Sequence, residues 1–442
     1  EIFVLMTKDS LCAIITNDKN HFKRRDNEME KEVKVSVIVP VYNSEAFIRQ
    51  TAEYILGQSL KDIEIIFVDD GSTDKTREIL EEISKTDDRV KVLHQQNSFA
   101  GAARNYGFRE SSGKYLVFWD ADDIFLPEAL EKMYDKIVED DADICICPAD
   151  YYDNETSKIL KNNVYIKYDM IPEKTPFFKE DVEDVLFNFS TNVPWNKMFK
   201  RELITDNNLE FQQIQRANDN YFVMTAFFYA NTFTYIKESV IQYRINLSTS
   251  LIGGNSKTPL CVYEAYKKTY DRIKDEAGFD KVRQSFLNKA MRACFYFLSV
   301  QTKFESYEVL YNKYKNEVFK EWNYPEDKEF YYNEKDYNRY QRMKESTAIE
   351  FMVCEYQGAI NEVRKLKNSR YQLRLKNDRL KDKNDRLREK NEKLKVAKEN
   401  LKAQVSRLKA RIAEIENSTS FKIGKAITYL PGLIKKAIKG KK

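Results

Sequence analysis

The 442-residue sequence has few of the residues that dominate several large protein classes. It contains 12 glycines and 9 prolines, too few for a collagen-like or low-complexity structure. With only two histidines, a catalytic histidine or a histidine-based metal centre is a poor interpretation. No run approaches the ~20 consecutive apolar residues of a membrane-spanning helix. The 42% of hydrophobic residues, rich in tyrosine and phenylalanine, predict a sizeable core and two or three structural units.

The six cysteines are scattered along the chain. Cys145 and Cys147 alternate with isoleucines, as residues of a buried strand do. No second cysteine or histidine pair accompanies them at the spacing of a zinc site. We therefore expect structural thiols in a reducing cytosol.

The net charge of +4 conceals two oppositely charged parts. Residues 351–442 hold 26 Lys and Arg against 10 Asp and Glu, whereas the rest of the chain holds 48 against 60. An acidic body with a basic C-terminal part predicts an anionic partner for that part, either a membrane or a nucleic acid.

Short β-branched runs alternate with amphipathic helical patterns in the first third of the chain. We predict strands at 33–41, 63–68, 90–94 and 114–119, and helices at 44–57 (capped by Ser44), 74–84 and 100–110. This alternation is typical of a doubly wound α/β sheet, whose ligands bind beyond the carboxyl ends of the strands. Asp69-Asp70 and Asp120 to Asp123 fall at such ends. Carboxylates there suit Mg²⁺ or Mn²⁺.

Four blocks in this order carry a family resemblance: VSVIVPVYNSEAFI, IIFVDDGSTDKT, NSFAGAARNYGF and GKYLVFWDADD. They resemble the family 2 glycosyltransferases, inverting enzymes of the bacterial polysaccharide and teichoic-acid type. Their GT-A fold is a Rossmann-like, doubly wound mixed sheet. Weaker similarity continues through PWNKMFKRELI, NDNYF and YRINLSTS, to about residue 250.

The resemblance implies a metal-dependent hexosyl- or N-acetylhexosaminyltransferase. It would use Mn²⁺ or Mg²⁺ and a nucleotide diphosphate-sugar, with uridine the expected base. The expected acceptor is a hydroxyl of a lipid-linked or polymeric glycan in cell-surface polysaccharide synthesis. A teichoic-acid glycosyltransferase acting on a polyol phosphate is the alternative within the same class.

The resemblance also implies roles for single residues. Asp219 is the expected general base, with Asp123 as the next candidate, and Asp122 is the expected metal ligand. Where the family usually has an acid before the base, this chain has Asn218. That departure raises the hypothesis of a catalytically silent, nucleotide-sugar-binding scaffold.

Two further sets of residues follow from the resemblance. The expected donor-binding residues are Pro40, Tyr42, Asn43, Asp69, Asp70, Asn97, Arg104, Asp120, Ala121, Asp122, Arg244, Ser248 and Ser250. Asp69 or Asp70 would receive the uracil N–H. The expected acceptor-side residues are Trp195, Lys197 and Asp123.

A heptad repeat begins near residue 366. Leucine or isoleucine recurs every seven residues at Leu366, Leu373, Leu380, Leu387, Leu394, Leu401, Leu408 and Ile415. Asn377, Asn384 and Asn391 each stand four residues after one of these leucines. Leucine at d with asparagine at a is typical of a parallel two-stranded coiled coil, so we expect a homodimer.

The last residues form a basic amphipathic pattern. Phe421 to Lys442 contain seven lysines and no acid, with Ile423, Ile427, Leu430, Ile434 and Ile438 on one helical face. This pattern is typical of a helix that lies on an anionic membrane surface. We therefore expect a cytoplasmic protein, peripheral at the inner face of the cell membrane. A DNA-binding zipper would need a basic helix immediately before the repeat, and an acidic body precedes it here, so we expect no nucleic acid partner.

The sequence thus predicts an α/β GT-A domain followed by a helical region, a parallel coiled coil and an amphipathic C-terminal helix. The expected boundaries are a disordered leader at 1–32, a GT-A domain at 33–250 (33–150 for the nucleotide-sugar, 151–250 for the acceptor), a helical region at 251–350, a coiled coil at 351–417 and a basic tail at 418–442.

Overall fold

The computed structural model describes residues 32–247, 256–420, 422–424 and 426. The expected leader apart from residue 32, the two expected donor-binding residues Ser248 and Ser250, and most of the basic tail lie outside these residues. The chain divides into two compact units between Phe351 and Met352. Within the described ranges, no helix is both long enough and apolar enough to cross a membrane.

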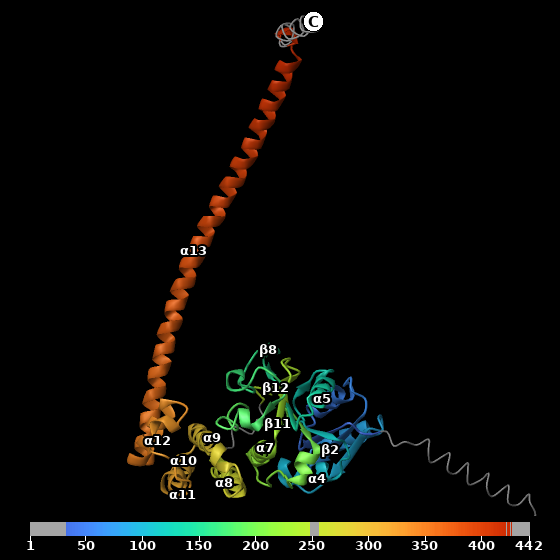
Figure 1. The fold of residues 1–442 in the computed structure, drawn as a ribbon, viewed down its shortest axis with the longest axis vertical. Coiled ribbons are helices and arrows are strands. Elements are labelled where there is room, and N and C mark those ends of the chain that lie inside the picture. The colour runs from blue at the N-terminus through green and yellow to red at the C-terminus, as the bar shows by residue number, and fades with distance from the viewer. Residues whose placement is uncertain (1–31, 248–255, 421, 425, 427–442) are drawn as a thin grey trace, which may run out of the picture. The chain divides into compact units, whose positions relative to one another are not determined.

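Strands and helices alternate at the start of the first unit in the predicted order (Figure 1). These elements are β1 (Val35–Val41), α2 (Ile48–Leu56), β2 (Ile63–Asp69), α3 (Thr76–Ser84), β3 (Val90–His94), α4 (Phe99–Arg109), β4 (Tyr115–Phe118), β5 (Ile124–Phe125), α5 (Ala129–Glu139) and β6 (Ile144–Ile146). The helix predicted from Ser44 begins only at Ile48. Ser44 does not cap it: the N-cap residue is Phe47, and no side chain makes a capping hydrogen bond. The Ser44 hydroxyl instead donates to the Tyr42 carbonyl at 3.1 Å.

Eight strands form one mixed sheet in the order β3-β2-β1-β4-β10-β6-β11-β9. Strands β1 to β4 run parallel, and β10 (Lys197–Lys200) is antiparallel to both β4 and β6. Because β1 lies between β2 and β4, the carboxyl ends of these strands meet at one edge of the sheet. The two acidic clusters are therefore brought to the same edge, as the sequence predicts.

A smaller sheet of four strands has the order β5-β12-β7-β8. The strands not yet given are β7 (Ala149–Asp153), β8 (Lys158–Leu160), β9 (Phe177–Phe178), β11 (Thr232–Tyr235) and β12 (Ile241–Ile245). Since β5 directly follows the turn after β4, its pairing with β12 places β12 beside that turn.

Alternate residues of β1 enter different hydrophobic cores, since successive strand residues point to opposite faces. Val35 and Val37 share one core with residues of α2, α3 and α5. Ile38 belongs to a second core, which contains residues of α7 (Asn218–Tyr229). Helices therefore cover both faces of the large sheet, which confirms the predicted doubly wound arrangement.

The predicted helical region follows, and it shares the core of α7. Its main helices are α8 (Cys261–Ile273), α9 (Phe279–Ser299), α10 (Phe304–Lys313) and α12 (Glu334–Glu345). The shorter helical elements of this unit are α6 (Arg201–Asp206), α11 (Phe319–Glu321), η1 (Tyr168–Met170), η2 (Lys179–Asp181), η4 (Tyr314–Val318) and η5 (Lys328–Phe330). Tyr266 and Phe286 from the region lie in one cluster with Phe222 and Phe227 of α7. A division at residue 250 therefore separates sequence segments but not hydrophobic cores.

The second unit consists largely of α13 (Ala348–Asn417). This helix is continuous over 70 residues, about 105 Å at the usual rise per residue (Figure 1). The heptad repeat thus lies on a single uninterrupted helix. Its pairing in a coiled coil stays a prediction.

Candidate active site

The loops after β1 and β2 are tied together by hydrogen bonds. The Asn43 side-chain oxygen accepts from the Thr73 N–H at 2.8 Å, and the Asn43 N–H donates to Ser72 Oγ at 3.0 Å. Asn43 has a φ of 46°, which asparagine tolerates better than most residues. At Gly71, with a φ of 77°, a Cβ would lie 2.9 Å from the backbone N of Asn97. These contacts fix the shape of the surface beside half-buried Pro40 and exposed Tyr42.

Asp69 and Asp70 are both buried, but their carboxylates are engaged differently. Asp69 uses both oxygens: Oδ1 accepts from the Ser72 N–H at 3.0 Å, and Oδ2 lies 3.2 Å from His94 Nδ1. Asp70 uses Oδ1 twice, accepting from Gln95 Nε2 at 2.6 Å and the Ser98 N–H at 2.8 Å. Among the described residues none donates to Asp70 Oδ2. That oxygen is therefore available to a ligand N–H.

The side chain of Arg104, on α4, joins the turn after β4 to the start of α7. Its Nη2 donates to Asp120 Oδ1 at 2.7 Å, and its Nη1 donates to Asn218 Oδ1 at 2.9 Å. Helix α4 can pack closely against the backbone of Gln212 because residue 101 is glycine. A Cβ there would lie 2.2 Å from the Gln212 carbonyl oxygen. The buried guanidinium thus holds the two predicted halves of the site together.

The turn after β4 gathers three carboxylates. Asp120 and Asp122 are half-buried and Asp123 is buried. Burial, followed by the charge of Asp120, raises the pKa of Asp122 to about 6. Burial, followed by the charge of Asp122, raises the pKa of Asp123 well above its usual range. The neighbouring charges therefore make ionisation of Asp122 and Asp123 harder, an environment that a divalent cation would relieve.

The residues of this turn fit a cation that is held partly by a substrate. In the part of the chain that the structure describes, no group of three or more His, Cys, Asp or Glu is placed to hold a metal. Mg²⁺ is commonly bound by one or two carboxylates together with substrate phosphates. Asp122 is not paired with a basic side chain within these residues, whereas Asp120 is paired with Arg104. Asp122 is accordingly the carboxylate best suited to a cation.

Asp123 and Arg244 contact each other inside the protein. Asp123 Oδ1 accepts from the backbone N–H of Arg244, on β12, at 3.0 Å. Asp123, expected on the acceptor side, is buried, and its Oδ2 has no hydrogen-bond partner among the described residues. Its contact with an acceptor stays a prediction. The Arg244 guanidinium donates to Gln50 Oε1 at 2.6 Å and to Asn154 Oδ1 at 3.3 Å. These two partners were not predicted, because they lie 194 and 90 residues away in the sequence and leave no local signal.

Asp219 is the second residue of α7, directly after the asparagine that holds Arg104. Burial raises the pKa of Asp219, and the nearby Arg104 opposes that rise. A raised pKa suits a carboxylate that must accept a proton. Next in the chain, Asn220 Oδ1 accepts from Asn192 Nδ2 at 2.6 Å, and Asn192 Nδ2 also lies 3.3 Å from the Tyr266 hydroxyl. This polar group was not predicted, since its members are distant in sequence and match no motif.

Trp195 and Lys197, expected on the acceptor side, are both buried, and their contact with an acceptor stays a prediction. Trp195 stacks on Tyr243, with ring centroids 5.5 Å apart and planes inclined by 3°. Lys197 Nζ donates to the carbonyl oxygens of Thr191 and Val193, each at 2.8 Å. Burial also lowers the pKa of Lys197 well below its usual range. Both side chains stabilise the segment that carries Asn192 and do not reach the surface.

The fold and this site are those expected of a glycosyltransferase of the GT-A type. The sequence profile described as Glycosyl transferase family 2 matches residues 36–206. Glycosyltransferase GlyG of Streptococcus pneumoniae is 33% identical over 218 residues, which are 48% of this chain and 70% of that protein. The chain belongs to glycosyl transferase family 2, as the sequence motifs suggest.

Two further relatives show how far the similarity extends. EpsH of Bacillus subtilis is 35% identical over 218 residues, 49% of this chain and 62% of that protein. Glycosyltransferase GlyA of Streptococcus pneumoniae is 33% identical over 216 residues, 48% of this chain and 30% of that protein. The chain thus spans less than two thirds of the length of either relative.

A solved structure shares the fold beyond the family region. Residues 1–349 of S. aureus TarS, in complex with UDP, align with a TM-score of 0.53 and 23% sequence identity. The alignment covers 71% of this chain and 90% of that chain. It confirms the predicted GT-A-like mixed sheet with a helical region after it.

Replacing Arg104 by lysine should weaken UDP binding in the presence of Mn²⁺ at least about tenfold while the fold persists. Lysine keeps the charge, but its single ammonium cannot span Asp120 and Asn218 as the planar guanidinium does. Titration calorimetry measures the affinity, and circular dichroism checks the fold. Arg109→Lys, at the exposed end of the same helix, is the matched control and should bind UDP like the wild type. Equal affinity of Arg104→Lys and wild type would contradict this role.

Proposed function

We propose that this chain transfers a sugar from a UDP-sugar, with inversion, to a hydroxyl of a lipid-linked glycan acceptor in cell-surface polysaccharide synthesis. The observation that carries the proposal is the Arg104 bridge, which links Asp120 to the residue preceding Asp219. A single displacement requires the donor-binding acids and the base to face one anomeric carbon. This bridge joins the two elements that carry them, and membership of the family supports the reaction type.

The nucleotide is proposed to bind where the loops after β1 and β2 meet. Asp70 Oδ2 would accept the uracil N–H, because both Asp69 oxygens already have partners. The residues proposed to border the nucleoside are Pro40, Tyr42, Asn43 and Asn97. TarS, which shares the fold, was solved in complex with UDP, and this is consistent with a uridine donor.

Asp122 is proposed to hold Mn²⁺ or Mg²⁺ together with the donor diphosphate, and Asp120 and Ala121 to border the ribose and the sugar. When bound, the cation stabilises the charge that develops on the departing UDP. The burial and mutual repulsion that raise the pKa of Asp122 to about 6 support a cationic ligand at this turn. Arg244, Ser248 and Ser250 are proposed to border the diphosphate.

Asp219 is proposed to accept the proton of the acceptor hydroxyl. The hydroxyl oxygen then bonds to the anomeric carbon on the face opposite UDP, the bond to UDP breaks, and the product has inverted configuration. The raised pKa of Asp219 supports this role. The neutral Asn218 satisfies Arg104 without adding a second negative charge beside the base, so its presence is compatible with catalysis.

Residues 33–250 are proposed to form the transferase domain, with residues 251–350 stabilising its α7 face. The basic tail, residues 418–442, is proposed to bind an anionic membrane at the cytoplasmic face. Seven lysines without an acid, together with an apolar stripe, support this location. A peripheral enzyme would there reach acceptors that are anchored in lipid.

Asp122→Ala should abolish metal-dependent UDP binding and the release of UDP from UDP-sugars while the fold persists. The measurement is UDP release with Mn²⁺ and a panel of UDP-sugars, with and without glycan or polyol-phosphate acceptors. Asp141→Ala removes an exposed carboxylate beyond α5 and should behave like the wild type. Normal turnover by Asp122→Ala would move the metal site elsewhere. No UDP release by the wild type with any donor would favour a silent scaffold.

Asp219→Asn should lower transfer by about 10²–10⁴-fold while UDP binding stays unchanged, because the base acts only when the hydroxyl loses its proton. Asp280→Asn, at an exposed acid in the first turn of α9, is the matched control. Transfer rates with an acceptor measure the effect, and NMR of the product gives the anomeric configuration. An unchanged rate would reassign the base, and a retained configuration would rule out single displacement.

Deleting residues 421–442 should release the protein from vesicles that contain phosphatidylglycerol, while donor hydrolysis persists. Each lysine near an anionic surface contributes about 1 kcal/mol, so binding should also weaken steeply with salt. Co-sedimentation measures binding, with phosphatidylcholine vesicles as the control. Failure of the full chain to bind anionic vesicles at low salt would end the membrane assignment.

A further inference from the structure

The helix α13 exposes the apolar seam of its heptad repeat. The eight residues at d, Leu366 to Ile415, have 49% to 68% of their surface exposed. Because α13 has no break between them, the heptad phase is kept along the whole repeat. The d residues therefore form a regular row of exposed apolar side chains on the described helix, with polar residues at most of the a positions between them: Arg370, Asn377, Asn384, Asn391 and Lys398.

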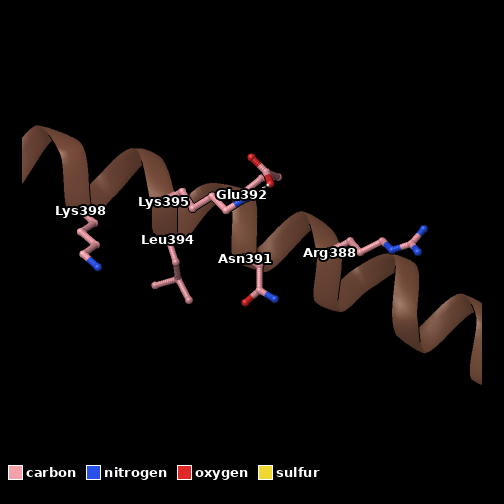
Figure 2. A pocket seen from close by; sticks show the side chains of 6 residues that line it. All are labelled: Arg388, Asn391, Glu392, Leu394, Lys395 and Lys398. Atoms are coloured by element: carbon pink, nitrogen blue, oxygen red, sulfur yellow. Dashed lines mark hydrogen bonds and ion pairs between the residues drawn. The ribbon is translucent and has the colours of Figure 1, made fainter.

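A hollow on this helix has the arrangement of a knob-binding hole. It measures about 450 Å³ and is lined by Arg388, Asn391, Glu392, Leu394, Lys395 and Lys398 (Figure 2). Residues 391, 394, 395 and 398 are spaced i, i+3, i+4 and i+7, as are the four residues that surround a d side chain of a facing helix. In Figure 2, Asn391, Leu394 and Lys398 project from the same side of the helix. The face thus fits an apolar knob from a second helix.

The positions that flank the seam are basic. All seven e positions between residues 366 and 415 are basic: Lys367, Arg374, Lys381, Arg388, Lys395, Lys402 and Lys409. Four of the seven g positions are also basic: Lys376, Lys383, Lys390 and Arg411. The acids of this segment all lie at b, c or f, away from the seam: Asp378, Asp382, Asp385, Glu389, Glu392, Glu399 and Glu414. The edges of the seam therefore carry charge of one sign.

Pairing with a second copy would set these like charges against each other. In a parallel pair each g residue faces the e residue five positions later in the partner. The facing like-charged pairs would be Lys376 with Lys381, Lys383 with Arg388, and Lys390 with Lys395, whereas the fourth basic g residue, Arg411, would face Glu416. An antiparallel pair would bring e to e and g to g, with the same result. Arg370 and Lys398, at a positions, would also meet basic or polar side chains inside a parallel seam.

Ion pairs within the helix offset only part of this charge. Arg388 lies 3.9 Å from Asp385, and Lys395 lies 2.8 Å from Glu392. Such exposed pairs contribute little. Along the described part of α13, the three g lysines at 376, 383 and 390 have no acidic partner. The charge that flanks the seam is thus left for a partner helix.

We propose that the seam of α13 binds an amphipathic helix of a different protein, apolar at its own d positions and acidic at its e and g positions. Burial of the leucines would supply most of the binding free energy. The basic flanking residues would favour an acidic partner over a second copy of this chain. The homodimer expected from the leucines alone is the competing outcome.

The first test uses the full chain and two labelled synthetic peptides. One peptide has the sequence of residues 366–415 with glutamate at every basic e and g position. The control peptide carries the same number of glutamates, placed instead at b, c and f positions. The first peptide should bind at least about tenfold more tightly by fluorescence anisotropy, and the difference should shrink as salt rises. Equal binding of the two peptides would show a non-specific charge effect and overturn the proposal.

The second test exchanges charge on the protein. The variant K376E/K383E/K390E converts three repulsive g–e contacts per chain into attractive ones. It should self-associate on the order of a hundredfold more tightly than the wild type in sedimentation equilibrium, and it should lose the acidic peptide. The control R379E/R386E/K393E makes the same charge change at c positions and should do neither. A wild-type chain that already forms a tight, salt-insensitive dimer would overturn the proposal in favour of a second copy.

Discussion

The arrangement of this site depends on a single buried guanidinium. A buried charge is costly unless it is paired and hydrogen-bonded. Arg104 is paired with Asp120 and hydrogen-bonded to Asn218, which lies 114 residues further along the chain, while its Nε has no partner among the described residues. The two acceptors belong to the turn after β4 and to the start of α7, the elements that carry the proposed cation ligand and the proposed base. Loss of this side chain would leave both without their common partner. Gly101 is part of the same constraint, since any Cβ there would push α4 away from the Gln212 carbonyl oxygen.

The acidic turn distributes different tasks among neighbouring carboxylates. Asp120 is balanced by Arg104, Asp123 binds the backbone of β12, and Asp122 remains without a basic partner in the described residues. Burial raises the pKa of Asp122 and Asp123, so the turn is poorly suited to holding several free negative charges. A divalent cation would change that balance, and the donor diphosphate would share in binding it. Asn218 likewise adds no negative charge to the site, because its neutral side chain accepts a hydrogen bond from Arg104 without repelling Asp219.

The first unit and α13 carry unbalanced charge of opposite sign. In the first unit, acids cluster at the edge of a sheet, where a cation and a nucleotide can balance them. Along α13, basic residues flank a row of apolar residues, where acids of another chain can balance them. Both features leave part of the chain's charge unbalanced by its own side chains. The transferase chemistry and the association surface are therefore separable properties, carried by different parts of the sequence.

The sequence alone determined the order of strands and helices, the position of the acidic clusters at strand ends, the family and the continuity of the heptad helix. These depend on local pattern: β-branched runs, helical periodicity and short motifs are each recognised in windows of about 11–18 residues. Only the tertiary structure decided which carboxylate oxygens remain available. It engaged both oxygens of Asp69 but one of Asp70, and it buried Trp195, Lys197 and Asp123, which the motifs had placed at the acceptor. It also brought Gln50 to Arg244 across 194 residues. Such contacts form when distant segments pack against one sheet. Local periodicity does not predict which distant residues will come into contact.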